Sequence, residues 1–170
     1  MAYNTLNVKR LLIIRHAKSS WDYPELSDFD RPLNKRGKRD LPDMANRLAK
    51  KQYKIDLFLS SPAKRALKTA IGHAQALGLS APPIVEEHRL YHASSTSIRS
   101  LISEIDNSID SLAIFGHNPG FTDLINELSD LDLWNLPTCA ICIIDLPIQS
   151  WNEIKSITGD QVYYDYPKSK

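Results

Sequence analysis

Two side chains suited to binding an anion follow the first apolar run of the chain. Residues 11–14 have the composition of a buried strand, and Arg15 and His16 come directly after it. In open α/β sheets, ligands bind beyond the carboxyl ends of the strands, which is where this pair would lie. An arginine offers a planar fork of donors to phosphate oxygens, and a neutral imidazole can act as a nucleophile or a base. The pair therefore predicts an anion site, whereas an isolated dipeptide of this kind is more often a surface turn.

Two further strand ends carry side chains of the same kind. Arg65 comes one helical turn after Ser-Ser-Pro at residues 60–62, and His117 lies in residues 116–120, which contain two glycines. If the three strands are neighbours, two histidines and two arginines converge on one pocket, and two helix N-termini point backbone donors at it. Arginines would neutralise a phosphoryl group, one imidazole would attack phosphorus, and the other would donate to an equatorial oxygen. The arrangement predicts phosphoryl chemistry.

An alternation of strand and helix patterns would position these strand ends. We expect strands over residues 11–14, 55–59, 82–86 and 112–115, and helices over residues 35–51, 63–77, 94–105 and 121–128. This alternation predicts an α/β fold, a three-layer α/β/α sandwich with a mainly parallel central sheet. Pro42 would mark a kink in the first of these helices or a later start. Ser61 would cap the second helix, with Pro62 in its first turn.

The last third of the chain has a different pattern. Residues 140–145 and 150–157 are strand-like, and we expect them to pair as a hairpin or as adjacent edge strands. Residues 160–170 are polar and contain tyrosines, and no clear element is expected there. Cys139 and Cys142 lie in the strand-like residues 138–144, where residues three apart would point to opposite faces of a sheet. We therefore expect two buried, reduced thiols rather than a redox pair or half of a zinc site.

Length and composition favour one globular domain. The chain has 170 residues, of which 42% are hydrophobic and 24% charged, and we expect a single domain over residues 1–170 with a core over about residues 8–160. The net charge of +1 gives no overall field that would attract nucleic acid or a membrane, so an anion site must be local. The run at residues 11–14 is too short for a secretory signal, and no run approaches the roughly 20 apolar residues of a membrane span. We expect a cytoplasmic protein.

Taken together, the motifs resemble those of the histidine phosphatase superfamily. The matching segments are residues 15–21, 31–37, 60–66 and 116–120, in this order along the chain. They are most similar to the SixA-type phosphohistidine phosphatases, which implies a phosphoglycerate mutase-like fold. The resemblance also implies a transiently phosphorylated His16, phosphoryl oxygens held by Arg15 and Arg65, and a pocket completed by His117. It implies no metal and no cofactor. Ala17 stands where the wider family has glycine.

Several residues near the four central ones are candidates for substrate contacts. We assign Lys18, Ser20, Asn118 and His92 to substrate binding. Lys18 and Ser20 follow the nucleophile and would line the mouth of the pocket, unless they belong to a solvated loop. His92 would orient the substrate or supply a proton. His73 falls within a helix pattern and is interpreted as a packing or surface residue.

The polar loop after the first strand carries two arginines with two interpretations. Arg31 and Arg36 would recognise a phosphoprotein, because loops at this edge of a sheet usually carry function. Alternatively they would pair with Asp28, Asp30 or Asp40, as surface arginines usually do.

A general acid is missing from the position where related enzymes have one. Phosphoglycerate mutases and acid phosphatases carry a Glu or Asp after the third element, where this chain has Tyr91, His92 and Ala93. An alkoxide leaving group needs a proton donor, whereas an imidazole, with a conjugate acid of pKa near 6.5, leaves with little help. We therefore expect hydrolysis of phosphohistidine on a protein, such as the histidine phosphotransfer domain of a signalling relay.

Two alternatives stay open. A small-molecule phosphomonoesterase of the same superfamily would need Glu86, Glu87 or another carboxylate as its acid. An adaptor that binds phosphoryl groups without turnover belongs to a different class of protein. The presence of both histidines and both arginines argues against the adaptor.

Overall fold

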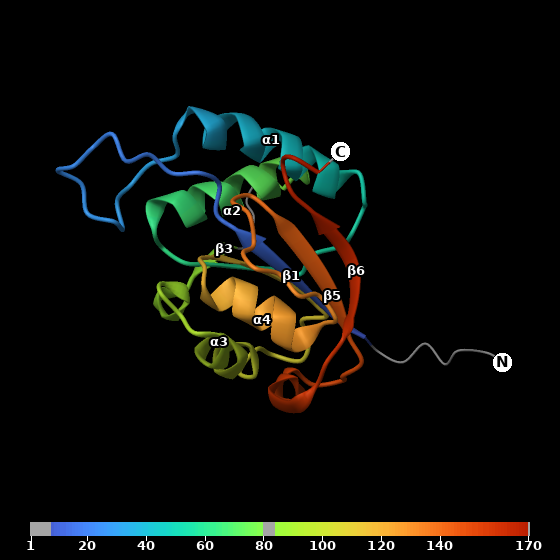
Figure 1. Ribbon diagram of the computed structural model, residues 1–170. Helices are drawn as coiled ribbons and strands as arrows, with labels where there is room; N and C mark the ends of the chain where they lie inside the picture. The colour runs from blue at the N-terminus through green and yellow to red at the C-terminus, as the bar shows by residue number, and fades with distance from the viewer. Residues whose placement is uncertain (1–7, 80–83, 170) are drawn as a thin grey trace.

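A six-stranded sheet forms the centre of the computed structural model, which describes residues 8–79 and 84–169 (Figure 1). The strands are β1 (Lys9–Arg15), β2 (Leu57–Ser60), β3 (Ile84–Glu86), β4 (Ser111–Gly116), β5 (Ile141–Leu146) and β6 (Asp160–Asp165). The helices are α1 (Lys35–Ala49), α2 (Lys64–Ala76), α3 (Ser95–Ile102) and α4 (Gly120–Leu128), with two short 3-10 helices, η1 (His88–Leu90) and η2 (Trp151–Ser156). Over the part of the chain just given, no helix is long and apolar enough to cross a membrane.

The sheet has the order β3-β2-β4-β1-β5-β6, which places β1 in its middle. β1, β4, β2 and β3 run parallel to one another, whereas β5 is antiparallel to β1 and β6 is antiparallel to β5. Arg15 lies opposite Gly116 across β1 and β4, and Ser60 lies opposite Phe115 across β2 and β4. The carboxyl ends of these three strands therefore meet at one edge of the sheet, which is where α/β folds bind ligands.

β1 divides the hydrophobic core into two layers. Its residues 11–14 are fully buried, and successive side chains point to opposite faces of the sheet. Leu11 and Ile13 pack in the layer that contains α3 and α4, and Leu12 and Ile14 pack in the layer that contains α1 and α2. Figure 1 shows α1 and α2 above the sheet and α3 and α4 below it. The predicted three-layer α/β/α sandwich with a mainly parallel sheet is confirmed.

The predicted strand over residues 150–157 is wrong. Trp151–Ser156 is the 3-10 helix η2, and the partner of β5 is β6, in the polar tail where no element is expected. Glu153 closes a capping box, and the buried indole of Trp151 donates its N–H to the carbonyl of Ile109 at 2.7 Å. These bonds favour a turn of helix over a strand. β6 has no apolar run because its side chains are exposed or half-buried, so its order comes from pairing with β5.

Three smaller expectations need adjustment. α3 ends at Ile102 rather than at residue 105, because the chain turns there and Ser103 donates its hydroxyl proton to the carbonyl of Ser100. α1 runs through Pro42 as one helix, so the predicted later start is wrong. Asn34 caps its N-terminus, because its side-chain oxygen accepts from the backbone N–H of Gly37 at 2.9 Å. The strand expected over 82–86 is β3, and residues 82 and 83 lie outside the described residues.

The two cysteines are buried free thiols, as predicted. Cys139 packs in the layer with α1 and α2, and Cys142 packs in the layer with α3 and α4, so they face opposite sides of the sheet. Burial raises the pKa of both thiols to about 12. Both are therefore protonated and unreactive at neutral pH.

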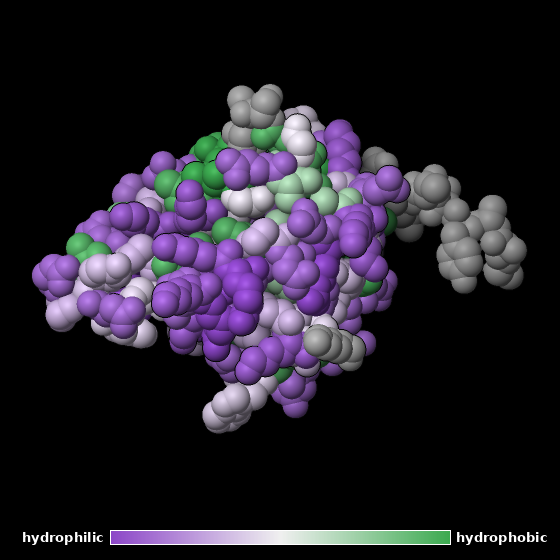
Figure 2. Space-filling model, turned by 90° about the horizontal axis from the view of Figure 1, so that it is seen from above, coloured by the Kyte–Doolittle hydropathy of each residue, from purple (hydrophilic) through white to green (hydrophobic). Residues whose placement is uncertain are grey.

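The face of the molecule covered by α1 is mostly hydrophilic (Figure 2). The loop between β1 and α1 projects from one side of this face and extends past the carboxyl end of β1 (Figures 1 and 2). This loop therefore lies beside the edge of the sheet at which the three predicted motifs meet.

Candidate active site

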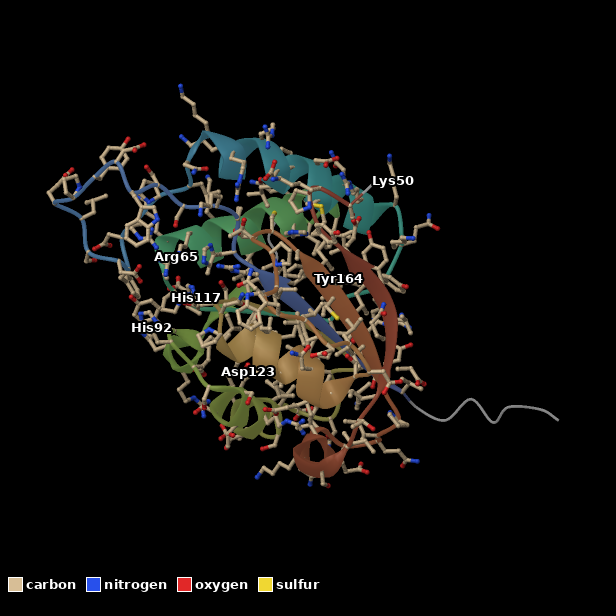
Figure 3. The ribbon with its side chains drawn as sticks, viewed as in Figure 1. Lys50, Arg65, His92, His117, Asp123 and Tyr164 are labelled. Atoms are coloured by element: carbon tan, nitrogen blue, oxygen red, sulfur yellow. The ribbon has the colours of Figure 1, made fainter. Side chains whose placement is uncertain are left out.

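The three predicted strand ends deliver their side chains to one place. The rings of His16 and His117 have centroids 5.1 Å apart, and Arg65 donates from Nε to His16 Nε2 at 3.3 Å. Figure 3 shows Arg65 and His117 close together at the carboxyl end of the parallel strands, with His92 farther out. The backbone of His16 is fixed on both sides, because its N–H donates to Gly116 and its carbonyl accepts from Cys139.

The imidazole of His16 is held in one tautomer. Its Nδ1 lies 2.7 Å from the carbonyl oxygen of Ala17, which can only accept, so the proton is on Nδ1 and the Nε2 lone pair accepts the hydrogen bond from Arg65 Nε. The ring is 7% exposed, and burial, together with the positive charges of Arg65 and Arg15, lowers the pKa of His16 well below its usual value. His16 is therefore neutral and presents a nucleophilic nitrogen toward Arg65.

The turn that carries His16 is tied to α2. The N–H of Ala17 donates to the hydroxyl of Thr69 at 3.0 Å, and that hydroxyl donates to the carbonyl of Arg65 at 2.7 Å. Ala17 is fully buried, so its methyl group fits where the wider family has glycine. Thr69 links the nucleophile to Arg65, a role that its position within a helix pattern does not indicate.

Asp28 holds Arg65 from the projecting loop. Arg65 is 3% exposed and donates to the Asp28 carbonyl at 2.5 Å and to its carboxylate at 3.0 Å. Tyr91 donates its hydroxyl to the same carboxylate at 2.7 Å. Burial raises the pKa of Asp28, but the hydrogen bonds from Tyr91 and Arg65 outweigh it and hold that pKa well below its usual range. The structure therefore adds an ionised carboxylate and a phenol to the predicted site.

Arg15 uses only part of the hydrogen-bonding capacity of its guanidinium group. It donates from Nη1 to the carbonyl of Leu136 at 2.5 Å, while its buried Nε has no hydrogen-bond partner among residues 8–79 and 84–169. Burial and the nearby charge of Arg65 lower the pKa of Arg15, although a guanidinium stays charged at any ordinary pH. Two like charges held close together under burial favour an anion that binds between them.

His117 is neutral as well. Its Nε2 lies 2.8 Å from the hydroxyl of Ser61, and its Nδ1 lies 3.4 Å from Arg65 Nη2. Burial and the charge of Arg65 lower the pKa of His117 to about 3. Ser61 was expected to be the N-cap of α2, but the N-cap is Ala63, whose backbone N–H lies 3.3 Å from the Ser61 hydroxyl. Ser61 instead orients the second histidine.

The four predicted substrate-binding residues occupy different places. Asn118 donates to Leu136, the carbonyl that also binds Arg15. His92 is exposed, with Nε2 3.6 Å from the Asp28 carboxylate and a ring centroid 6.2 Å from that of His117. Lys18 lines a cavity beside α1. Ser20 is buried and donates its hydroxyl to Asp22 at 2.9 Å, so its hydroxyl helps to shape the loop.

Arg31 of the loop and Arg36, which lies in the first turn of α1, make pairs that the second interpretation predicts. Arg31 lies 2.9 Å from the Asp28 carboxylate and stacks on Trp21, with its guanidinium carbon 3.6 Å from the ring centroid. Arg36 makes a long pair with Asp40 at 3.9 Å. The pair between Arg31 and Asp28 steadies the carboxylate that holds Arg65.

The two glutamates considered as acids lie on and after β3. Glu86 is exposed, and the Glu87 carboxylate accepts from the side chain of Arg89 at 3.1 and 3.0 Å. His73 is fully buried in α2 and packs on Phe115 with ring centroids 5.7 Å apart, so the packing interpretation is confirmed.

The sequence places this arrangement in a known family. Residues 11–119 match the sequence profile of the histidine phosphatase superfamily, branch 1. This segment spans more than half of the chain and contains Arg15, His16, Arg65 and His117. The chain belongs to the histidine phosphatase superfamily. An uncharacterized chloroplast protein of Arabidopsis thaliana is 29% identical over 159 residues, which cover 89% of this chain and 72% of that protein.

Solved histidine phosphatase structures share the fold. SixA of Agrobacterium tumefaciens, assigned as a phosphohistidine phosphatase, has a TM-score of 0.78 and 26% identity, with coverage of 94% of this chain and 98% of that one. The resemblance to SixA-type proteins is therefore confirmed. A mycobacterial glucosyl-3-phosphoglycerate phosphatase has the same fold, with a TM-score of 0.66, 16% identity, and coverage of 91% of this chain and 97% of that one.

Proposed function

We propose that this histidine phosphatase hydrolyses phosphohistidine on a protein through a covalent phosphohistidine at His16. The proposal depends on one observation. The buried His16 imidazole is neutral, and its Nε2 atom lies 3.3 Å from Arg65 Nε. A buried neutral nitrogen beside two guanidinium groups is suited to attack a phosphoryl group that those groups bind.

The first step transfers the phosphoryl group to the enzyme. Arg15 and Arg65 bind its oxygens, and His16 Nε2 forms a bond to phosphorus while the bond to the substrate nitrogen breaks. The leaving nitrogen takes the electron pair of the broken P–N bond, and the ring departs as neutral imidazole because its other nitrogen carries a proton. A phosphoryl dianion between the arginines raises the pKa of His117, so the protonated ring can donate to an equatorial oxygen.

The second step restores the enzyme. Water attacks phosphorus in line with His16 Nε2, the P–N bond breaks with its electron pair returning to Nε2, and dihydrogen phosphate leaves with both protons of the attacking water. The same arginines and His117 stabilise both transition states, because the charge on the equatorial oxygens is similar in each.

We favour an N-phosphoryl substrate because two carboxylates in and near the site, those of Asp28 and Glu87, are engaged with arginines. Asp28, the carboxylate bound to Arg65, is ionised at neutral pH and has no proton to give. Glu87 is paired with Arg89. An alkoxide would leave slowly from such a site, whereas imidazole, the conjugate base of an acid with pKa near 6.5, leaves without a strong donor.

The same proposal covers partners and place of action. We propose that the substrate is a phosphorylated protein, such as a histidine phosphotransfer domain, that the reaction needs no metal or cofactor, and that it occurs in the cytoplasm. We also propose that residues 1–170 act as a single domain. The resemblance to SixA-type proteins supports the substrate class.

Two peptides of one sequence test the proposal, one with phosphohistidine and one with phosphoserine. We expect a kcat/KM for the phosphohistidine peptide at least ~100-fold higher, since an unassisted alkoxide forgoes the usual 10²–10⁴-fold contribution of a general acid. His16→Ala is expected to abolish turnover of both peptides. Equal turnover would point to a phosphomonoesterase with an acid such as Glu86. Phosphate binding without any turnover would point to an adaptor.

A further inference from the structure

A cavity of about 680 Å³ lies beside the candidate active site and is not used by the reaction described above. It is open to solvent on one side and bordered by α1, by the loop before β5 and by the chain after β6. Its lining residues are Arg15, Lys18, Arg36, Arg39, Asp40, Asp43, Arg47, Asn135, Pro137, Thr138, Tyr166, Pro167 and Lys168. Figure 2 shows that the face over α1 is most strongly hydrophilic near its middle.

The lining is strongly basic. It includes six arginines and lysines but only two aspartates, in a chain whose net charge is +1. Arg39 pairs with Asp40 at 2.9 Å, and Arg47 pairs with Asp43 at 2.7 Å, so the two aspartates are already neutralised. Among residues 8–79 and 84–169, Lys18 and Lys168 have no carboxylate within ion-pair distance. The cavity therefore has an excess of positive charge.

The cavity adjoins the phosphoryl site through shared side chains. Arg15 lines it, and within the part of the chain that the structure describes, the buried Nε of Arg15 has no hydrogen-bond partner. Lys18 lies two residues after His16 in sequence and also lines it. A group bound in the cavity would therefore belong to the same substrate as a phosphoryl group bound at His16.

Ionic and hydrogen bonds fix the far walls of the cavity. Arg47 of α1 donates from Nη1 to the Asp165 carboxylate at 3.2 Å and to the carbonyl of Tyr166 at 3.4 Å. Arg36 donates to the hydroxyl of Thr138 at 3.2 Å, which ties α1 to the loop before β5. The basic groups are thus carried on elements that are bound to one another rather than on a free tail.

The length of the cavity favours a segment of chain over a small anion. Arg36 and Arg47 are eleven positions apart on one helix, which corresponds to about 16 Å along its axis. One phosphate or carboxylate contacts only a small part of that length, whereas an extended peptide of five residues covers it.

We propose that this cavity binds acidic side chains that flank the phosphohistidine in the protein substrate. The inference rests on the proposed function and names the kind of sequence that the enzyme selects. Glutamates or aspartates near the phosphohistidine would pair with Lys18, Arg36 and Lys168, and the phosphoryl group would lie between Arg15 and Arg65. Acidic flanking residues would raise both the rate of encounter and the affinity.

The test compares two phosphohistidine peptides that differ only in flanking Glu or Gln residues. We expect wild type to favour the Glu peptide by ~10-fold in kcat/KM, because only this peptide forms charge pairs with the exposed basic side chains. The double variant Arg36→Glu/Lys168→Glu should lose this preference or reverse it. Lys155→Glu makes a charge change of the same sign and half the size in η2, on the opposite side of the molecule, and should keep the preference.

Each remaining outcome has a definite meaning. Equal turnover of the two peptides by wild type, or the same loss in Lys155→Glu as in the double variant, overturns the inference. If wild type prefers a small bisphosphate to a monophosphate but shows no preference for the Glu peptide, the cavity binds a small anion, and the proposal that it binds a protein substrate is wrong. If wild type hydrolyses neither peptide, the proposed function fails. Fluorescence anisotropy can then still measure binding of the unphosphorylated Glu peptide. If the double variant binds this peptide as tightly as wild type does, the inference about the cavity is wrong.

Discussion

The histidine pocket and the basic cavity share Arg15 but handle charge in opposite ways. In the pocket, His16, Arg65 and His117 are each less than 8% exposed, and burial keeps both imidazoles neutral. In the cavity, Arg36, Arg39 and Lys168 are exposed to water, and the side chain of Arg39 is 73% exposed. One region excludes water from reacting groups, and the other leaves its charges hydrated.

This difference assigns distinct tasks to the two regions. A buried neutral imidazole is a nucleophile at neutral pH, whereas an exposed one would be partly protonated and hydrated. Exposed charges gain little from any single pair but act together on a multiply charged ligand. Chemistry in the pocket should therefore respond strongly to single substitutions, and recognition in the cavity should respond weakly to them and strongly to salt.

Among the side chains around the nucleophile, loss of Arg65 is expected to have the largest effect on catalysis. Arg65→Ala removes the guanidinium that contacts His16, His117 and Asp28, and we expect kcat/KM to fall by ~10³-fold or more. Arg89→Ala is the matched control, because Arg89 pairs with Glu87 and Glu104 on the surface. A fall of less than tenfold in a folded Arg65→Ala protein would contradict the assignment of catalysis to this pocket.

Asp28 tests whether the loop positions the pocket. Asp28→Asn keeps the size of the side chain but weakens its bonds to Arg65 and Tyr91, and we expect kcat to fall by ~10–100-fold through misplacement of Arg65. Inhibition by vanadate, a phosphoryl analogue, should weaken in parallel. Asp30→Asn, in the same loop, should leave both quantities unchanged. Unaltered vanadate inhibition in Asp28→Asn would show that Arg65 does not need this carboxylate.

His73 separates the effect of burial from that of catalysis, because it is a buried histidine that packs on Phe115 and lies outside the histidine pocket. Burial lowers its pKa to about 3, so the unfolded chain binds more protons than the folded one between about pH 6.5 and pH 3. Stability is fully present above this window and falls with pH inside it, by up to ~1.4 kcal/mol per pH unit. His73→Met should move acid unfolding, followed by circular dichroism, to lower pH. The exposed His88→Met should leave it in place, and equal shifts would contradict the account.

The smallest expected effect is that of salt, which should weaken recognition in the cavity but not catalysis in the pocket. Raising salt from about 0.1 M to about 1 M shortens the Debye length from about 10 Å to about 3 Å. We expect the preference for a Glu-flanked peptide to shrink several-fold, while kcat for the Gln-flanked peptide changes little. A preference that is equally strong at both salt concentrations would exclude open charges as its source.

The sequence predicts the pocket better than the walls around it. Arg15, His16, Arg65 and His117 follow strands that are recognisable as apolar runs, and the carboxyl ends of parallel strands meet at one edge. The contact between Asp28 and Arg65 joins positions 37 residues apart and depends on how a polar loop folds. Local patterns indicate only the nearer pair, between Arg31 and Asp28, which the structure also contains.

The same reasoning explains the error at the far edge of the sheet. β6 is ordered by pairing with β5 and has exposed or half-buried side chains, so no apolar run marks it in the sequence. The cavity beside α1 also escapes prediction, because the chain after β6 forms one of its walls. Elements specified by tertiary contacts rather than by their own pattern are those that sequence reasoning misses.

The most direct test of the account is the chemical state of His16 during turnover. Wild type would be mixed with excess phosphohistidine peptide, quenched in alkali within milliseconds, digested and analysed by mass spectrometry. We predict a phosphoryl group that is stable in alkali and labile in acid on the peptide containing His16, and none on that peptide in His16→Ala. Turnover without this phosphopeptide, or a phosphoryl group found on His117 instead, would contradict the account.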